Sequence, residues 1–187
     1  MPGPGLPPFV YIRLSWATHP YNMPQPRIMG SRMFDIVYGP TDKYPAGRRG
    51  QVMLAAWEGY SDPATAGMLV QDGDTVIDPF DYAIMVTVLT EFPDCVVTSP
   101  VKLWRKADTD GWVWAHWRGQ ASQNLTFDPD FFCFNFTYLP RRLLEACGKK
   151  GMRSWSFPTV DTRVARVARE TGIPVRVARC TPKHMNF

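Results

Sequence analysis

The sequence contains no long hydrophobic segment. Among its 187 residues, no apolar run approaches the roughly 18 residues that a membrane-spanning helix requires. Residues 1–5 also lack the basic and apolar regions of a secretory signal peptide. We therefore expect a protein without membrane partners, located in the cytoplasm, or in the host cytoplasm if it is viral.

Cysteine is scarce as well, and its few copies are widely separated. No C-x-x-C pair occurs, and no two cysteines are spaced as in a zinc site or a disulfide framework. We expect reduced, buried thiols at all four positions, which are Cys95, Cys133, Cys147 and Cys180.

The apolar content is sufficient for one core. Hydrophobic residues make up 45% of the chain and aromatic residues 13%, and the length is within the range of a single domain. We expect a flexible lead-in rich in proline and glycine over residues 1–8 and one domain over residues 9–187, without internal repeats.

Charge is distributed unevenly along the chain. The net charge is +4, but the residues from Arg141 onward hold eleven Lys and Arg against three acids. That part therefore carries +8, and residues 1–140 carry −4. The asymmetry favours a protein that binds a metal with one part and a polyanion with the other. Arginines that merely solvate helix faces explain it equally well.

Apolar, β-branched runs alternate with helical patterns along most of the chain. The predicted strands cover residues 9–14, 34–38, 67–71, 95–98, 131–138 and 175–178, with an antiparallel hairpin over 101–119. The predicted helices cover residues 50–60, 79–89 and 140–147, and a last helix runs from its N-cap Asp161 to Gly172. This order predicts an α/β fold of the Rossmann-like kind, with a mixed, mainly parallel sheet flanked by helices. Ligands of such sheets gather beyond the carboxyl ends of the strands.

Asp-x-Asp occurs three times, but only one copy follows a predicted buried strand. The copies at 108–110 and 128–130 lie in a polar turn and in a loop, whereas Asp72 and Asp74 come directly after the apolar run 67–71. Gly73 between them lets both carboxylates converge. Hard oxygen ligands suit Mg²⁺ or Mn²⁺, which keeps waters and phosphate oxygens as its other ligands. A plain strand-ending turn is the alternative.

Residues 68–79, which include both acids, resemble the D-x-D segment of GT-A glycosyltransferases. Similar order continues in the following strand (95–104), in an acceptor-side strand and helix (131–144), in an aromatic loop that ends at Asp161, and in the tail 181–184. The resemblance implies a single GT-A-like domain with a nucleotide-sugar and metal half at 9–100 and an acceptor half at 101–187. It also implies a nucleotide-sugar donor such as a UDP-sugar.

The resemblance further implies roles for individual residues. Asp72 and Asp74 would coordinate Mn²⁺ or Mg²⁺, His184 would be a third ligand, and the metal would neutralise charge on the leaving diphosphate. Asp161 would be the general base that takes a proton from the acceptor hydroxyl if the enzyme inverts the anomeric centre. A surface histidine and a plain helix N-cap are the respective alternatives.

The nucleotide would lie near the first predicted helix. Arg48 and Arg49 precede that helix at a place where GT-A enzymes often contact the nucleotide, and guanidiniums at a helix N-terminus suit an anion. Asp72 would also contact the nucleotide. The acid that these enzymes present near the first strand is missing from residues 11–22, and Asp42 is the nearest candidate. A solvated arginine pair is the alternative for Arg48 and Arg49.

The acceptor side carries the basic residues. Arg163, Arg166 and Arg169 recur every three residues along the helix that begins at the proposed base, which predicts a positive strip beside the acceptor. Trp155 precedes them in the aromatic loop and is a further candidate acceptor contact. Short glycosyltransferases of this kind resemble those of bacteriophages and bacteria that modify DNA bases, proteins or glycans. The basic strip favours a hydroxymethylated pyrimidine in DNA as the acceptor.

Two other classes of protein stay open. A nucleotidyltransferase couples a related fold to paired acids and a metal, although it usually carries a glycine-rich phosphate loop with a lysine near its first strand, and this sequence has none. A non-enzymatic basic DNA-binding protein would explain the charge, but it does not need acids at the end of a strand. Metal-dependent affinity for a nucleotide would separate the enzymes from the binding protein.

Overall fold

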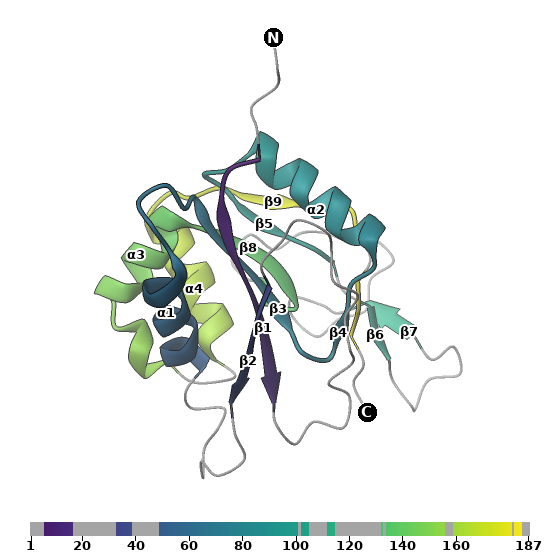
Figure 1. The fold of residues 1–187 in the computed structure, drawn as a ribbon, viewed down its shortest axis with the longest axis horizontal. Helices are drawn as coiled ribbons and strands as arrows, with labels where there is room; N and C mark the ends of the chain where they lie inside the picture. The colour runs from purple at the N-terminus through teal and green to yellow at the C-terminus, as the bar shows by residue number, and fades with distance from the viewer. Residues whose placement is uncertain are drawn as a thin grey trace.

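The computed structural model describes residues 6–16, 33–38, 49–100, 102–104, 112–114, 132, 134–155, 159–180 and 182–184. Its centre is a six-stranded sheet in the order β2-β1-β3-β8-β5-β9 (Figure 1). These strands are β1 (Phe9–Trp16), β2 (Met33–Tyr38), β3 (Gly67–Asp72), β5 (Val96–Thr98), β8 (Phe136–Pro140) and β9 (Val175–Val177). Five of them run parallel, and β8 runs against its neighbours β3 and β5. The predicted mixed, mainly parallel sheet is therefore confirmed.

Helices cover both faces of this sheet (Figure 1). α1 (Arg49–Tyr60), α3 (Arg141–Lys149) and α4 (Thr159–Glu170) gather on one face, and α2 (Pro79–Glu91) lies on the other. Successive side chains of a strand point to opposite faces. Val70 accordingly packs in the core cluster that contains α1, α3 and α4, whereas Leu69 packs with Leu89 of α2. No helix in the described stretches is long and apolar enough to cross a membrane.

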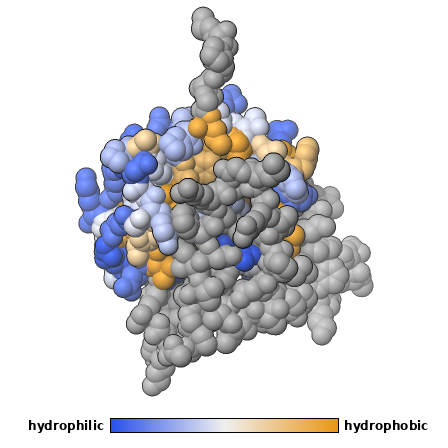
Figure 2. All heavy atoms as spheres, viewed as in Figure 1, coloured by the Kyte–Doolittle hydropathy of each residue, from blue (hydrophilic) through white to orange (hydrophobic). Residues whose placement is uncertain are grey.

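The surface reflects this division into faces. In the view of Figure 2, hydrophilic residues gather over the side of α1 and α3, and apolar residues gather near the start of β1 and over α2. The three described cysteines, Cys95, Cys147 and Cys180, are buried free thiols, as expected. Cys133 lies outside the described residues.

A second, smaller sheet adjoins the turn after β3. It has the order β4-β10-β6-β7, with β4 (Thr75–Val76), β10 (Lys183–His184), β6 (Lys102–Trp104) and β7 (Trp112–Trp114). β6 and β7 pair antiparallel, which confirms the predicted hairpin. β10 was not predicted, and it brings the residues near the C-terminus beside β4 and β6.

Several predicted boundaries are wrong by a few residues. The strand predicted at 131–138 begins only at Phe136, because Phe134 and Asn135 form a turn before it. The helix predicted to stop at Gly148 continues to Lys149, and the chain turns at Gly151, whose φ of 84° is the left-handed conformation that favours glycine. The start of α2 is confirmed, because Asp78 and Asp81 form a capping box there.

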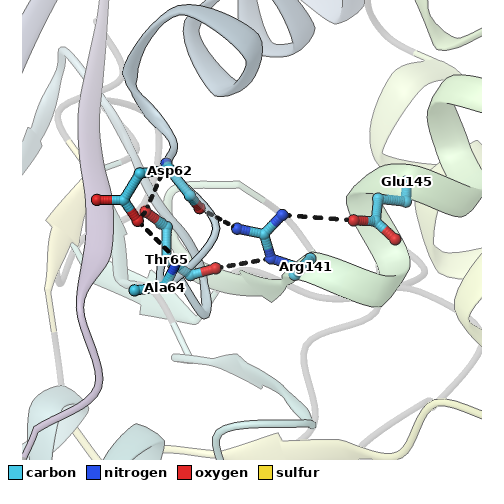
Figure 3. A network of polar contacts seen from close by, with 5 residues as sticks. All are labelled: Asp62, Ala64, Thr65, Arg141 and Glu145. Atoms are coloured by element: carbon cyan, nitrogen blue, oxygen red, sulfur yellow. Dashed lines mark hydrogen bonds and ion pairs between the residues drawn. The ribbon is translucent and has the colours of Figure 1, made fainter.

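Arg141 fixes the end of the sheet where β3 begins (Figure 3). Its Nε donates to the carbonyl of Thr65 at 2.8 Å, and its Nη2 donates to the carbonyl of Asp62. The guanidinium also lies 5.0 Å from the centre of the Trp57 ring and pairs with Glu145. The loop between α1 and β3 is thereby tied to α3, at the opposite end of β3 from Asp72.

Candidate functional site

Asp72, Gly73 and Asp74 lie at the carboxyl end of β3, in the turn that leads to β4. Backbone groups on either side hold this turn. The amide of Gly73 donates to the carbonyl of Leu14 in β1 at 2.8 Å, and the amide of Asp72 donates to the carbonyl of Asn135 at 3.1 Å. The turn therefore has little freedom to move relative to the sheet.

Gln71 braces the same turn from the other face of the sheet. Its side chain is fully buried, and its Nε2 donates to the carbonyl of Thr75 at 2.7 Å. The hydroxyl of Tyr11 donates to its Oε1. Because neighbouring residues of a strand point to opposite faces, a buried Gln71 on the α2 face directs Asp72 to the face of α1 and α4.

On that face Asp72 meets Arg49, the first residue of α1. Nη2 of Arg49 forms an ion pair with Oδ1 of Asp72, and the side chains are only 7% and 15% exposed, respectively. The Arg49 guanidinium also lies 5.4 Å from the centre of the Phe134 ring, which is within the distance of a cation–π contact. Arg49 was predicted to precede the helix as a nucleotide ligand, but it lies within the helix and faces inward.

Gly50 explains how the start of α1 comes so close to the rest of the site. Its amide donates to the carbonyl of Trp155 at 3.2 Å. A Cβ at this position would lie 2.2 Å from the carbonyl oxygen of Met152 and 2.9 Å from that of Trp155. Only glycine allows this approach, which presses Arg49 towards the segment that leads into α4.

Asp161 completes a group of charged residues, the acid–arginine cluster, which consists of Arg49, Asp72 and Asp161. Oδ2 of Asp161 accepts a hydrogen bond from the amide of Phe134 at 3.2 Å. Its Oδ1 has no contact with solvent and no hydrogen-bond partner among the described residues. Burial raises the pKa of Asp161 to about 6, with attraction to Arg49 lowering it and repulsion from Asp72 raising it.

The position of Asp161 within α4 differs from the prediction. The helix begins at Thr159, so Asp161 lies in its first turn and is not the N-cap. Its carboxylate instead accepts the amide hydrogen bond from Phe134, which is distant in the sequence. An acid in the first turn still benefits from the positive end of the helix dipole.

The residues at the turn fit a hard divalent cation by the chemistry of their donor atoms. Asp72 and Asp74 offer carboxylate oxygens, and Mg²⁺ usually takes one or two protein carboxylates and completes its shell with waters and phosphate oxygens. The described residues contain no group of three or more His, Cys, Asp or Glu that could hold a metal ion.

His184 lies near this turn in the second sheet. Its backbone pairs with Thr75, the residue after Asp74, so the tail and the acidic turn are neighbours. This is the juxtaposition that a late metal ligand requires. Its role as a ligand stays a prediction.

The other predicted site residues fall into three groups. Arg48 and Asp42 lie outside the described residues. Trp155 is 5% exposed and packs in the core, which leaves little of its ring for an acceptor. The arginine strip, which consists of Arg163, Arg166 and Arg169, is exposed along the solvent face of α4, opposite the buried Val164, Val167 and Ala168.

Two residues of the site were not predicted. Phe134 contributes its ring to Arg49 and its amide to Asp161, and Asn135 contributes its carbonyl to Asp72. Both lie in the aromatic run that was assigned to a single strand. The asparagine inside that run is a turn signal that could have indicated the break.

Comparisons with known proteins give a partial likeness of fold. No protein-family model and no curated protein matches the sequence. Among solved structures, A197 from STIV has a TM-score of 0.43 and 13% identity, over 94% of this chain and 81% of that one. An inositol-1-phosphate CTP transferase from T. maritima has a TM-score of 0.46 and 12% identity, over 80% and 59%. A glycosyltransferase involved in the glycosylation of the major capsid of PBCV-1 has a TM-score of 0.46 and 14% identity, over 91% and 82%. Function depends on site residues that a likeness of this degree does not specify.

Proposed function

We propose that this chain is a divalent-metal-dependent glycosyltransferase that moves a sugar from a nucleotide-sugar donor to a hydroxyl group. The main support is that Asp72 and Asp161, which are 89 positions apart in the sequence, belong to one charged cluster at the carboxyl edge of the sheet. Ligands of open α/β sheets bind at this edge. At such an edge, one acid can hold a metal against the phosphates of the donor, and the other can take a proton from the acceptor.

The three acids would have different tasks in the reaction. Asp72 and Asp74 would hold Mn²⁺ or Mg²⁺, which when bound neutralises the charge of the leaving nucleoside diphosphate. The bond from the sugar C1 to the diphosphate oxygen breaks, and the diphosphate keeps the electron pair. The acceptor oxygen forms the new bond to C1, and its proton passes to the carboxylate of Asp161.

The pKa of Asp161 suits this task. A general base works best when its pKa lies near the working pH, and burial raises the pKa of Asp161 to about 6. The carboxylate is thus mostly ionised at pH 7 yet more basic than an exposed acid. The groups that cover Oδ1 must move aside when an acceptor enters.

A hydroxymethylated pyrimidine in DNA is the acceptor that we propose. The arginine strip begins half a turn after Asp161 and continues along the exposed face of α4. Arg163 also lies 5.8 Å from the centre of the Trp155 ring, which orients the first guanidinium of the strip. Exposed arginines in a row can contact successive phosphates while one nucleotide is extruded towards the base.

The donor and the metal can be tested by thermal shift. Wild-type protein is melted with a panel of nucleotide sugars, with and without MnCl₂, alongside Asp72→Asn, Asp74→Asn and the control Asp94→Asn, an exposed acid on the loop after α2. A ligand at 100 times its dissociation constant adds about 2.7 kcal/mol of stability. We expect a metal-dependent shift in the wild type and the control only. Stabilisation by nucleoside triphosphates alone would favour a nucleotidyltransferase, and no metal-dependent shift would refute the proposal.

The acceptor is tested by transfer itself. Duplex DNA with hydroxymethylated pyrimidines is incubated with the donor and Mn²⁺, and the bases are analysed by mass spectrometry for an added sugar. Replacing the arginine strip by glutamine should weaken DNA binding and reduce the slope of log affinity against log salt by up to about 3. Arg176→Gln, an exposed arginine on β9, is the control. Transfer to a protein or glycan but not to DNA would show that the acceptor assignment is wrong.

A further inference from the structure

We propose that Arg49 is the internal counter-cation of the acid–arginine cluster and positions Asp72 for the reaction, instead of binding the nucleotide. The inference concerns the site of the proposed function, but its main test uses the ligand-free protein. The two ideas can therefore fail independently.

The surroundings of Arg49 leave little of it for a ligand. The residue is 6% exposed, and one of its terminal nitrogens pairs with Asp72. The guanidinium also faces the ring of Phe134. A guanidinium that binds a phosphate needs its fork of donors open to the ligand, whereas this one is directed into the protein.

The backbone prevents Arg49 from moving outward without a larger rearrangement. The next residue, Gly50, donates its amide to Trp155 and has no room for even a Cβ against Met152. The start of α1 is thus held against the segment that leads into α4. This contact between α1 and the segment that contains Met152 and Trp155 fixes the position of Arg49.

The charges of the cluster give Arg49 its role. Asp72 and Asp161 are both close enough to influence each other and Arg49, so the three side chains carry one negative charge when both acids are ionised. Removing the guanidinium would leave two largely buried carboxylates whose charges repel each other. Such a pair is strongly destabilising unless another cation takes the place of the arginine.

A double-mutant cycle on the ligand-free protein tests the ion pair. We expect Arg49→Met to lower the melting temperature by roughly 6–20 °C, which is the range for losing one partner of a buried ion pair in a chain of this size. The double variant Arg49→Met with Asp72→Asn should melt at a higher temperature than Arg49→Met alone, because it removes the carboxylate left without its partner. Arg49→Lys should retain most of the wild-type stability.

The matched control is Arg153→Met, which breaks an ion pair with Glu58 whose side chains are 56% and 49% exposed. That change should lower the melting temperature by at most about 4 °C. If Arg49→Met melts like the wild type, the proposal is overturned. If Arg49→Met does not fold, the double variant decides, since its folding supports the coupling and its failure to fold overturns it.

A second measurement separates positioning from a merely structural role. MnCl₂ alone, without nucleotide, should raise the melting temperature of Arg49→Met more than that of the wild type or Arg49→Lys, because the cation replaces the missing guanidinium between the carboxylates. An equal shift in all three proteins would overturn the positioning role. Failure of the proposed transferase function would instead appear as no transfer by the wild type, with the mutant cycle unchanged.

Discussion

Replacing Asp161 by asparagine should stabilise the protein by an amount that grows as the pH rises from about 3.8 to about 6. Burial raises the pKa of this acid from 3.8 to about 6 in the folded protein. At pH 7 the carboxylate is ionised in both the folded and the unfolded state, so the folded state bears the full cost of burying its charge. A pKa difference of about 2 units corresponds to about 3 kcal/mol.

The sign and the pH window follow from the two pKa values. A folded pKa above the unfolded one means that the protein loses stability as the pH rises from 3.8 to 6. Asparagine has no charge to bury, and its side-chain oxygen can still accept the amide hydrogen bond of Phe134. Asp161→Asn should therefore be more stable than the wild type by up to about 3 kcal/mol at pH 7.5 and by about half of that at pH 5. The two proteins should be equally stable near pH 3.

Urea denaturation followed by circular dichroism, at several pH values between 3 and 8, measures this difference. The melting temperature of the variant should exceed that of the wild type by roughly 6–12 °C at pH 7.5. Asp94→Asn, the same change at an exposed acid, is the control and should show no such trend. A variant that is less stable than the wild type at pH 7.5 would refute the account of Asp161 as an acid that is costly to ionise. The same variant should lose about 10²–10⁴-fold of transfer activity if Asp161 is the base.

Three further predictions concern the scaffold around the site. Gly50→Ala should cost about 1–3 kcal/mol in urea denaturation, because the new Cβ overlaps the carbonyl of Met152, whereas Gly59→Ala, which has open space, should not destabilise α1. Asp78→Ala should cost about 1 kcal/mol through loss of the capping box of α2, and an unchanged midpoint would contradict that role. Burial raises the pKa of the Cys147 thiol to about 12, so mass spectrometry should find it unmodified by iodoacetamide at pH 8 in native protein and modified in urea.

Much of the fold could be predicted because most elements carry local signals. Asp78 followed by proline indicates the start of α2, and the apolar run at 67–71 indicates β3. The reversed direction of β8 carries no such signal, since it depends on pairing with β3 and β5. β4 and β10 have two residues each, too few for any periodic pattern.

The acids of the candidate site could be singled out from the sequence, but the contacts that they make could not. Asp72 and Asp161 stood out by their place after a strand and at the start of a helix. Arg49 drew attention as a cation at a helix start, yet its ion pair with an acid 23 positions away depends on the packing of α1 against β3. The contributions of Phe134 and Asn135 are mainly made by backbone groups, which every residue type possesses. Sequence patterns do not reveal which backbone groups meet a given side chain.

The reversed direction of β8 links the register of this strand to the geometry of the acid–arginine cluster. Because β8 enters the sheet where its neighbours leave it, the residues just before it reach the acidic edge. A slip of β8 by one residue would exchange its two faces and would also withdraw the amide and the carbonyl that hold Asp161 and Asp72. A misaligned molecule would thus lose the arrangement of the acid–arginine cluster as well as stability.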